Sequence, residues 1–246
     1  MSDAAAKVAL ITGANKGIGF ETGRQLGALG ITVLLGARDM KKGEAAAAEL
    51  QREGIDARFL KLDVLDAGDR MAAAQAIESD FGRLDILVNN AAINLDQGAS
   101  LETSTTPAKT LRDTFDTNFF AVVELTQTML PLIRKSAAGR IVNVSSSQGS
   151  LSLLAPRNSP IYATKTFSYD ASKSALNSFT LHLAHELQGT PIKVNSIHPG
   201  WVRTDMGGPQ ATLGLADGAK TSVRLATLPD DGPTGGYFHM GETLPW

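Results

Sequence analysis

Tyr169 and Lys173 are the residues of this chain whose types and spacing most directly suggest chemistry. They stand four residues apart in a segment with a helical pattern, so both side chains project from one helix face. A phenol has an ordinary pKa of about 10, and a neighbouring ammonium group lowers it by favouring the phenolate. The pair predicts a general acid, Tyr169, which exchanges a proton with a carbonyl or alcohol oxygen while Lys173 tunes it.

A second tyrosine and lysine compete for this role in the segment Tyr162-Ala163-Thr164-Lys165. They are only three residues apart, and Pro160 argues against a regular helix at this point. The helical pattern that continues through Ala175–Leu187 favours Tyr169, so we expect Tyr162 to pack against the protein or to contact substrate.

Three consecutive serines follow the apolar run that begins at Arg140. A hydroxyl group at this point could hold a substrate oxygen by a hydrogen bond and stabilise the charge that develops on it. In an extended strand, Ser146 would lie on the opposite face from Ser145 and Ser147. The alternative is a serine-rich turn without a chemical role.

A glycine-rich segment, Thr12-Gly13-Ala14-Asn15-Lys16-Gly17-Ile18-Gly19, follows the first apolar run and opens a helix. Gly13 permits a tight turn, Gly17 lets the backbone approach a pyrophosphate, and Gly19 lets the helix pack on the strand. The helix N-terminus offers unpaired N–H groups to phosphates. The segment lacks the Gly-Lys-Ser/Thr ending of an ATP-binding loop, and the alternative is a turn that binds nothing.

Short apolar runs alternate with helical segments along the chain, as a parallel sheet covered on both faces requires. The predicted strands are Val8–Ile11, Ile31–Gly36, Ala57–Leu62, Ile86–Asn89, Arg140–Ser145 and Lys193–His198. The predicted helices are Gly17–Leu29, Met40–Glu53, Asp66–Phe81, Pro107–Ser136 (with a possible interruption) and Tyr169–Leu187. Ser146–Pro160 and Gly207–Gly218 are predicted loops. We expect a single α/β domain over residues 1–246, a doubly wound Rossmann-type fold with a parallel sheet flanked by helices.

Composition excludes several classes of function. The 246 residues carry a net charge of −2, with no basic stripe for nucleic acid or an anionic membrane. Cysteine is absent, so disulfides and thiolate chemistry are excluded. His182 and His185 lack a third ligand, so no metal site is expected. Without a signal-peptide pattern or an apolar run of ~20 residues, we expect a cytoplasmic protein with no membrane segment.

The motif TGANKGIG, together with Asn89-Asn90-Ala91 and Tyr169-Asp170-Ala171-Ser172-Lys173, resembles the short-chain dehydrogenase/reductase family over essentially the whole chain. TGANKGIGFE, LLGARD and Pro245-Trp246 resemble its carbonyl reductase branch. The resemblance implies reversible reduction of an aldehyde or ketone by a nicotinamide cofactor. It selects Ser146, three residues before Gly149, as the catalytic serine. It also implies that Asn118 holds a water for proton relay and that Lys173 bonds the cofactor ribose.

The resemblance also implies a set of cofactor-binding residues beyond the glycine-rich segment. Asp63 and Val64 would lie near the adenine, although Asp63 could instead cap the next helix. His198-Pro199-Gly200-Trp201-Val202-Arg203-Thr204 resembles the turn beneath the nicotinamide. The full set is Gly13, Asn15, Lys16, Gly17, Ile18, Gly19, Arg38, Asp63, Val64, Asn90, Ala91, Tyr169, Lys173, Pro199, Gly200, Val202 and Thr204. Ala92 departs from the family's usual Asn-Asn-Ala-Gly and loses glycine's freedom at positive φ.

Charges near the second predicted strand favour NADP(H) as the cofactor. An NAD-selective site places an acid at the end of that strand, where this chain has Ala37 followed by Arg38. Arg38 and Lys16 could make charge-assisted contacts with a 2′-phosphate. The alternative is that both are surface charges and Asp39 holds the ribose of NAD.

The substrate pocket is expected at the carboxyl ends of the strands, walled by Ile93–Gly98, Gln148–Tyr162 and Trp201–Leu215. A homodimer or homotetramer is expected through Pro107–Ser136 and Tyr169–Leu187. Three other functions compete: a 3-oxoacyl-thioester reductase, a sugar-nucleotide epimerase or dehydratase, and a non-catalytic NADP-sensing protein. An epimerase would need a further C-terminal substrate domain, and a sensor typically lacks the tyrosine or lysine. The identity of the carbonyl substrate is not evident from the sequence.

Overall fold

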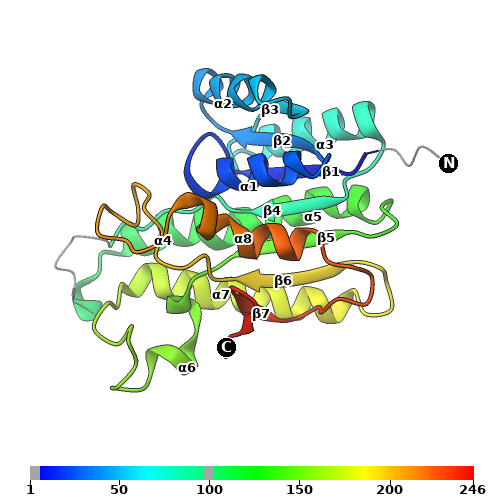
Figure 1. The fold of residues 1–246 in the computed structure, drawn as a ribbon. Coiled ribbons are helices and arrows are strands. Elements are labelled where there is room, and N and C mark those ends of the chain that lie inside the picture. Colours follow the sequence, from blue (N-terminus) through cyan, green and yellow to red (C-terminus); the bar gives the residue numbers. More distant parts are fainter. Residues whose placement is uncertain (1–5, 97–101) are drawn as a thin grey trace.

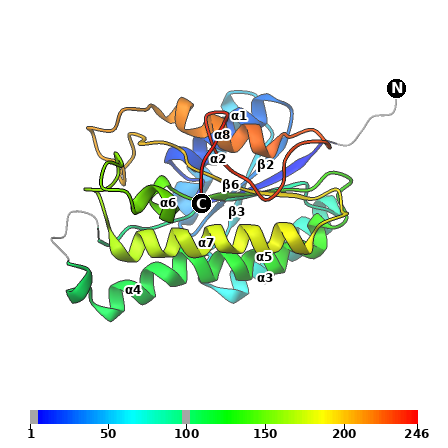
Figure 2. The ribbon, with the colours of Figure 1, turned by 90° about the horizontal axis from the view of Figure 1, so that it is seen from below.

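The computed structural model describes residues 6–96 and 102–246. Its centre is an eight-stranded sheet in the order β3-β2-β1-β4-β5-β6-β7-β8, with helices on both faces (Figures 1 and 2). The strands are β1 (Val8–Thr12), β2 (Thr32–Ala37), β3 (Ala57–Lys61), β4 (Ile86–Asn89), β5 (Arg140–Val144), β6 (Lys193–Ile197), β7 (Tyr237–His239) and β8 (Glu242–Thr243). All neighbouring strands pair in parallel except β8, which pairs antiparallel with β7. The predicted fold class is confirmed.

The main helices are α1 (Gly17–Ala28), α2 (Met40–Arg52), α3 (Ala67–Phe81), α4 (Ala108–Phe115), α5 (Ala121–Ile133), α6 (Leu151–Leu154), α7 (Phe167–Glu186) and α8 (Leu215–Ala226). Alternate residues of the buried strand β1 enter two separate cores. Ala9 and Ile11 pack with α1, α2 and α8, whereas Val8 and Leu10 face α3, α5 and α7. Figure 2 shows these helix layers on opposite sides of the sheet.

Strand β1 pairs with both β2 and β4. Strands β2 and β3 are therefore added on one side of β1, and β4 and the later strands are added on the other. The connections that leave the carboxyl ends of β1 and β4 therefore diverge, and a crevice opens between them. This is the place where doubly wound sheets bind their ligands, and the glycine-rich segment after β1 lies at its edge.

The structure confirms one expected interruption and differs from the sequence prediction in four elements, α6, α8, β7 and β8. A π-helical turn, Asp116–Phe120, separates α4 from α5 and is the interruption expected within 107–136. Helix α8 begins inside the predicted loop 207–218, and α6 lies inside the predicted loop 146–160, so both loop predictions are wrong at those residues. Strands β7 and β8 were not predicted, because three and two residues are too few to show a periodic pattern.

Within residues 6–96 and 102–246, every helix is too short or too polar to cross a lipid bilayer.

Candidate active site

The glycine-rich turn after β1 has backbone conformations and close contacts that favour glycine. Gly13 and Gly17 both have φ of +63°, which side-chain-bearing residues rarely adopt. A Cβ atom on Gly19 would lie 2.5 Å from Asn90 Nδ2, so a larger residue cannot fit without displacing that amide. The Thr12 hydroxyl accepts the backbone N–H groups of Asn90 and Ala91, each at 2.9 Å. These bonds fix the ends of β1 and β4 beside each other.

Ala92 causes no backbone strain at this junction. Among the described residues, Met240 is the only non-glycine with a positive φ, so the position of Ala92 does not need glycine's freedom. The departure from the family's usual motif is therefore accommodated without a change of backbone region.

A cavity of about 1180 Å³ runs from this turn along the carboxyl ends of the strands. It exceeds the roughly 300–1000 Å³ of a typical drug-sized site, as a dinucleotide with a second small molecule would require. Of the predicted cofactor residues, those that line it are Gly13, Asn15, Lys16, Gly17, Ile18, Arg38, Asp63, Val64, Asn90, Ala91, Tyr169, Lys173, Pro199 and Thr204. Gly19, Gly200 and Val202 lie outside the lining, and so do the predicted catalytic residues Asn118 and Ser146.

Two aspartates, Asp39 and Asp63, had alternative roles in the sequence analysis, and the helix caps at the far end of the cavity bear on both. Asp39 is the N-cap of α2 and accepts the backbone N–H of Lys42 at 3.0 Å. It does not line the cavity, whereas the exposed Arg38 does. Asp66 caps α3, which leaves Asp63 at the cavity wall. The cap assignments favour Arg38 over Asp39 as the residue that faces the adenosine ribose.

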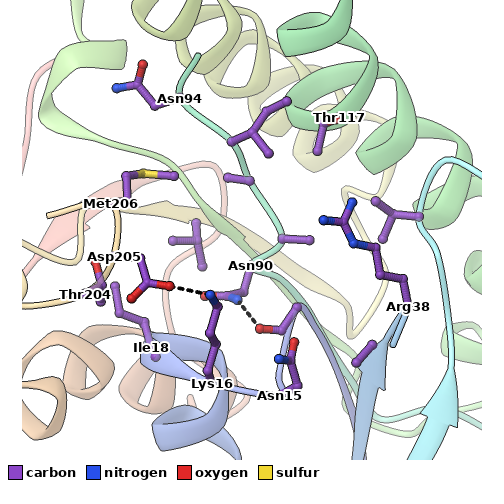
Figure 3. Close-up of a pocket in the computed structure, with 18 of the residues that line it drawn as sticks. Asn15, Lys16, Ile18, Arg38, Asn90, Asn94, Thr117, Thr204, Asp205 and Met206 are labelled. Atoms are coloured by element: carbon purple, nitrogen blue, oxygen red, sulfur yellow. Dashed lines mark hydrogen bonds and ion pairs between the residues drawn. The ribbon is translucent and has the colours of Figure 1, made fainter. Parts of the chain in front are cut away.

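Lys16 forms an ion pair with Asp205, which reaches it from the segment after β6 (Figure 3). Both side chains are largely exposed, so the pair contributes little to stability. The Lys16 ammonium was expected to face a 2′-phosphate. In this structure it instead links the glycine-rich turn to the opposite wall of the cavity.

Tyr169 and Lys173 lie on the sheet-facing side of α7, with exposed fractions of only 8% and 2%. The Lys173 ammonium donates to the Val144 carbonyl at 2.7 Å and lies 5.6 Å from the centre of the Tyr169 ring. Burial lowers the pKa of Lys173 to about 7. Burial also raises the pKa of Tyr169 to about 12, although a hydrogen bond with the Ser146 side chain acts in the opposite direction.

The prediction that Lys173 lowers the pKa of Tyr169 is therefore wrong for this structure. Loss of hydration disfavours both charged forms, and the Lys173 ammonium is directed at a backbone carbonyl rather than at the phenol. The competing Tyr162 lies in a turn beneath Lys165 and outside the cavity lining, which agrees with the preference for Tyr169.

Ser146 stands where β5 has ended and a short 3-10 turn, Ser147–Gly149, begins. Its backbone is extended, its side chain is buried, and its Oγ atom accepts the N–H of Gln148 at 3.3 Å. The contact with Tyr169 distinguishes Ser146 from its neighbours. The Ser145 hydroxyl points instead toward the Lys173 carbonyl, 3.5 Å away.

Asn118 lies fully buried in the π-helical turn, and its side chain is committed to protein partners. Its Oδ1 accepts the Ile93 N–H, and its Nδ2 donates to the Ile93 carbonyl, both at 2.8 Å. A further bond from Nδ2 reaches Ser172 Oγ at 3.1 Å. The side chain thus attaches the cavity wall at Ile93 to α7, and the expectation that Asn118 holds a water for proton relay stays a prediction.

The turn predicted to lie beneath the nicotinamide is held by hydrogen bonds among its own residues, 202–207. The Thr204 hydroxyl donates to the Val202 carbonyl at 3.3 Å and accepts the Gly207 N–H at 2.9 Å. The Val202 side chain is buried against Gly218. Of the predicted substrate walls, Ile93–Leu95 and Arg203–Met206 line the cavity together with Leu215, whereas Gln148–Tyr162 do not. The wall residues 97 and 98 lie outside the described residues.

Several residues at the site were not predicted. Asp113, Asp116 and Thr117 line the cavity, and the position of the last two directly before Asn118 was the available signal. Asp205 lies within the predicted wall 201–215, but its ion pair gave no such signal, because its partner Lys16 is 189 residues away. The buried Arg70 donates to the Val64 carbonyl at 2.7 Å and so supports, from outside, the cavity wall where the adenine is expected.

No group of three or more histidine, aspartate or glutamate side chains within residues 6–96 and 102–246 could hold a metal ion. His182 and His185 are exposed on α7.

Comparison with known proteins gives concordant results. Carbonyl reductase [NADPH] 1 of Sus scrofa is 34% identical, over 98% of this chain and 94% of the relative. The crystal structure of an NADPH-bound carbonyl reductase from chicken fatty liver matches with a TM-score of 0.86 and 26% identity, over 98% and 99% of the two chains. Salutaridine reductase from Papaver somniferum matches with a TM-score of 0.80 and 29% identity, over 94% and 99%.

The family model for short chain dehydrogenase matches residues 7–212, which include the glycine-rich turn, Tyr169 and Lys173. This match covers most of the chain and agrees with the resemblance carried by the sequence motifs. The chain therefore belongs to the short-chain dehydrogenase family.

Proposed function

We propose that this protein reduces an aldehyde or ketone to an alcohol with NADPH, using Tyr169 as the proton donor. The observation that carries the proposal is that Tyr169 and Lys173 line the same cavity as the glycine-rich turn. One cavity can therefore hold both a dinucleotide and a small substrate beside an acid. The NADPH in the names of the carbonyl reductase relatives supports the same assignment.

The residues present fit the cofactor. The glycine-rich turn at the start of α1 offers backbone N–H groups to a pyrophosphate. Arg38 and Lys16 offer cations to a 2′-phosphate, and Ala37 leaves no acid to repel it. Lys173 would bond the nicotinamide ribose. When bound, NADPH supplies the hydride for the carbonyl carbon.

Tyr169 has the protonation state that carbonyl reduction requires. A phenol whose pKa is near 12 stays protonated at neutral pH, which is the form that donates to a carbonyl oxygen. The Ser146 hydroxyl, which contacts Tyr169, would hold the same oxygen and stabilise the negative charge that develops there. Asn118 acts as a positioning residue, because it anchors Ile93 on the cavity wall to α7.

We further propose that residues 1–246 act as one domain and that the protein forms a homodimer or homotetramer. Phe120 on the π-helical turn and Leu181 on α7 have exposed fractions of 50% and 40%. Large apolar side chains on two neighbouring helices are typical of an interface between subunits. This supports the assembly face expected from the sequence.

A direct test measures the loss of NADPH absorbance with a panel of aldehydes and ketones. We expect turnover with at least one carbonyl compound, and the Tyr169→Phe variant should lose about 100-fold or more in kcat because the proton donor is gone. NADPH binding should persist in that variant, and the matched Tyr162→Phe variant should retain most of its activity. Undiminished turnover by Tyr169→Phe would refute the assigned acid.

A further inference from the structure

His198 joins two parts of the active site that come from different strands. It follows β6 directly and precedes Pro199, which lines the cavity. Its Nδ1 atom accepts the backbone N–H of Ser147 at 3.1 Å, and the backbone N–H of His198 donates to the Phe238 carbonyl at 2.8 Å. The imidazole therefore connects the turn after Ser146 to the turn that would lie beneath the nicotinamide.

The hydrogen bond determines the form of the imidazole. A backbone N–H can only donate, so Nδ1 must carry a lone pair and any ring proton must be on Nε2. Burial, together with the neighbouring His239 whose ring centre is 4.8 Å away, lowers the pKa of His198 to about 3. The neutral acceptor form is thus present throughout the physiological range.

The bond acts on the residue that follows the catalytic serine. Ser147 is the first residue of the 3-10 turn, where an N–H group has no acceptor within the turn itself. The same turn is closed by the Gly149 N–H, which donates to the Ser146 carbonyl at 2.7 Å. With its backbone held on both sides, Ser146 keeps the extended conformation from which its side chain contacts Tyr169.

We propose that His198 is a positioning residue, which fixes the catalytic serine turn relative to the cofactor turn through its bond to Ser147. The proposal rests on the carbonyl reduction proposed above. It implies that loss of this bond slows the chemical step, in which Ser146 must meet the substrate oxygen, more than it weakens NADPH binding.

The bond can be removed from either side. His198→Leu removes the acceptor, and His198→Asn offers a side-chain carbonyl in its place. Ser147→Pro removes the donor, and proline suits this position because it is the first of a helical turn and follows an extended residue. Each change removes one of the two bonds that hold the turn carrying Ser146, so we expect His198→Leu and Ser147→Pro each to lower kcat by about tenfold. His198→Asn should recover part of that loss.

The double variant His198→Leu/Ser147→Pro distinguishes this bond from general damage. If both changes act through one bond, the double variant should lose no more activity than either single variant. The KM for NADPH should stay within about twofold, and the kinetic isotope effect with deuterated NADPH should rise because the chemical step is slower. Arg52→Leu, at an exposed residue of α2 outside the cavity and the proposed subunit interface, is the control and should behave as wild type.

Additive losses in the double variant, or a parallel loss of NADPH affinity, would overturn the inference. Unchanged kcat in folded His198→Leu would also overturn it. If His198→Leu does not fold, the test rests on His198→Asn and Ser147→Pro. A kcat equal to that of the wild type in both of these variants would exclude a role for the bond. A wild-type protein that turns over no carbonyl compound would instead refute the proposed function.

Discussion

Arg38→Ala should weaken NADPH binding strongly and leave NADH binding almost unchanged. Arg38 is exposed at the cavity wall, and no other described residue forms an ion pair with it. Because the neighbouring Asp39 is occupied as the cap of α2, the guanidinium is available to a 2′-phosphate. A hydrogen bond to a charged group contributes about 1.5–3 kcal/mol, which corresponds to roughly 10- to 150-fold in affinity.

Lys16 should contribute less than Arg38. Its ammonium must leave Asp205 to reach a phosphate, but that pair is exposed and worth about 1 kcal/mol or less. Lys16→Ala should therefore cost less NADPH affinity than Arg38→Ala. Asp205→Asn should raise NADPH affinity by no more than about fivefold.

The assay compares Kd for NADPH and NADH by fluorescence, together with KM for each cofactor on one carbonyl substrate. Lys41→Ala removes an exposed cation of α2 that lies outside the cavity and serves as the control. Equal losses for NADPH and NADH in Arg38→Ala would refute the 2′-phosphate contact. A loss of NADPH affinity in Lys41→Ala as large as that in Arg38→Ala would show that only the overall charge matters.

Two further predictions concern stability. Burial raises the pKa of Asp170 from 3.8 to about 6, so the folded protein binds more protons than the unfolded chain between these values, and its stability should fall by at most about 3 kcal/mol as pH rises through them. Denaturant unfolding of Asp170→Asn should lack this decline, and parallel pH profiles would contradict the assignment. Thr12→Val should lower stability by about 1–3 kcal/mol for each backbone N–H that loses its acceptor, and it should weaken NADPH binding. Thr12→Ser is the control, and equal denaturation midpoints for the two variants would exclude the role of the hydroxyl.

Much of the fold was predictable because its signals are local. The first six strands were predicted to within one residue at each end, since buried parallel strands are continuous apolar runs. The turn after β1 and the spacing of Tyr169 and Lys173 were equally evident, because glycine conformations and helix periodicity act over a few residues. Helix α8 was missed, as the glycine and proline residues before it suggested a continuing loop.

The sequence by itself determined which groups are present at the site and on which elements they stand. Only the tertiary structure decided their protonation and their partners. The pKa of Tyr169 rises because the fold removes water from it, although the spacing to Lys173 predicted a fall. Asn118 binds Ile93, His198 binds Ser147 and Lys16 binds Asp205 across long stretches of chain. Burial and such contacts depend on how distant segments pack, which no local pattern of residues encodes.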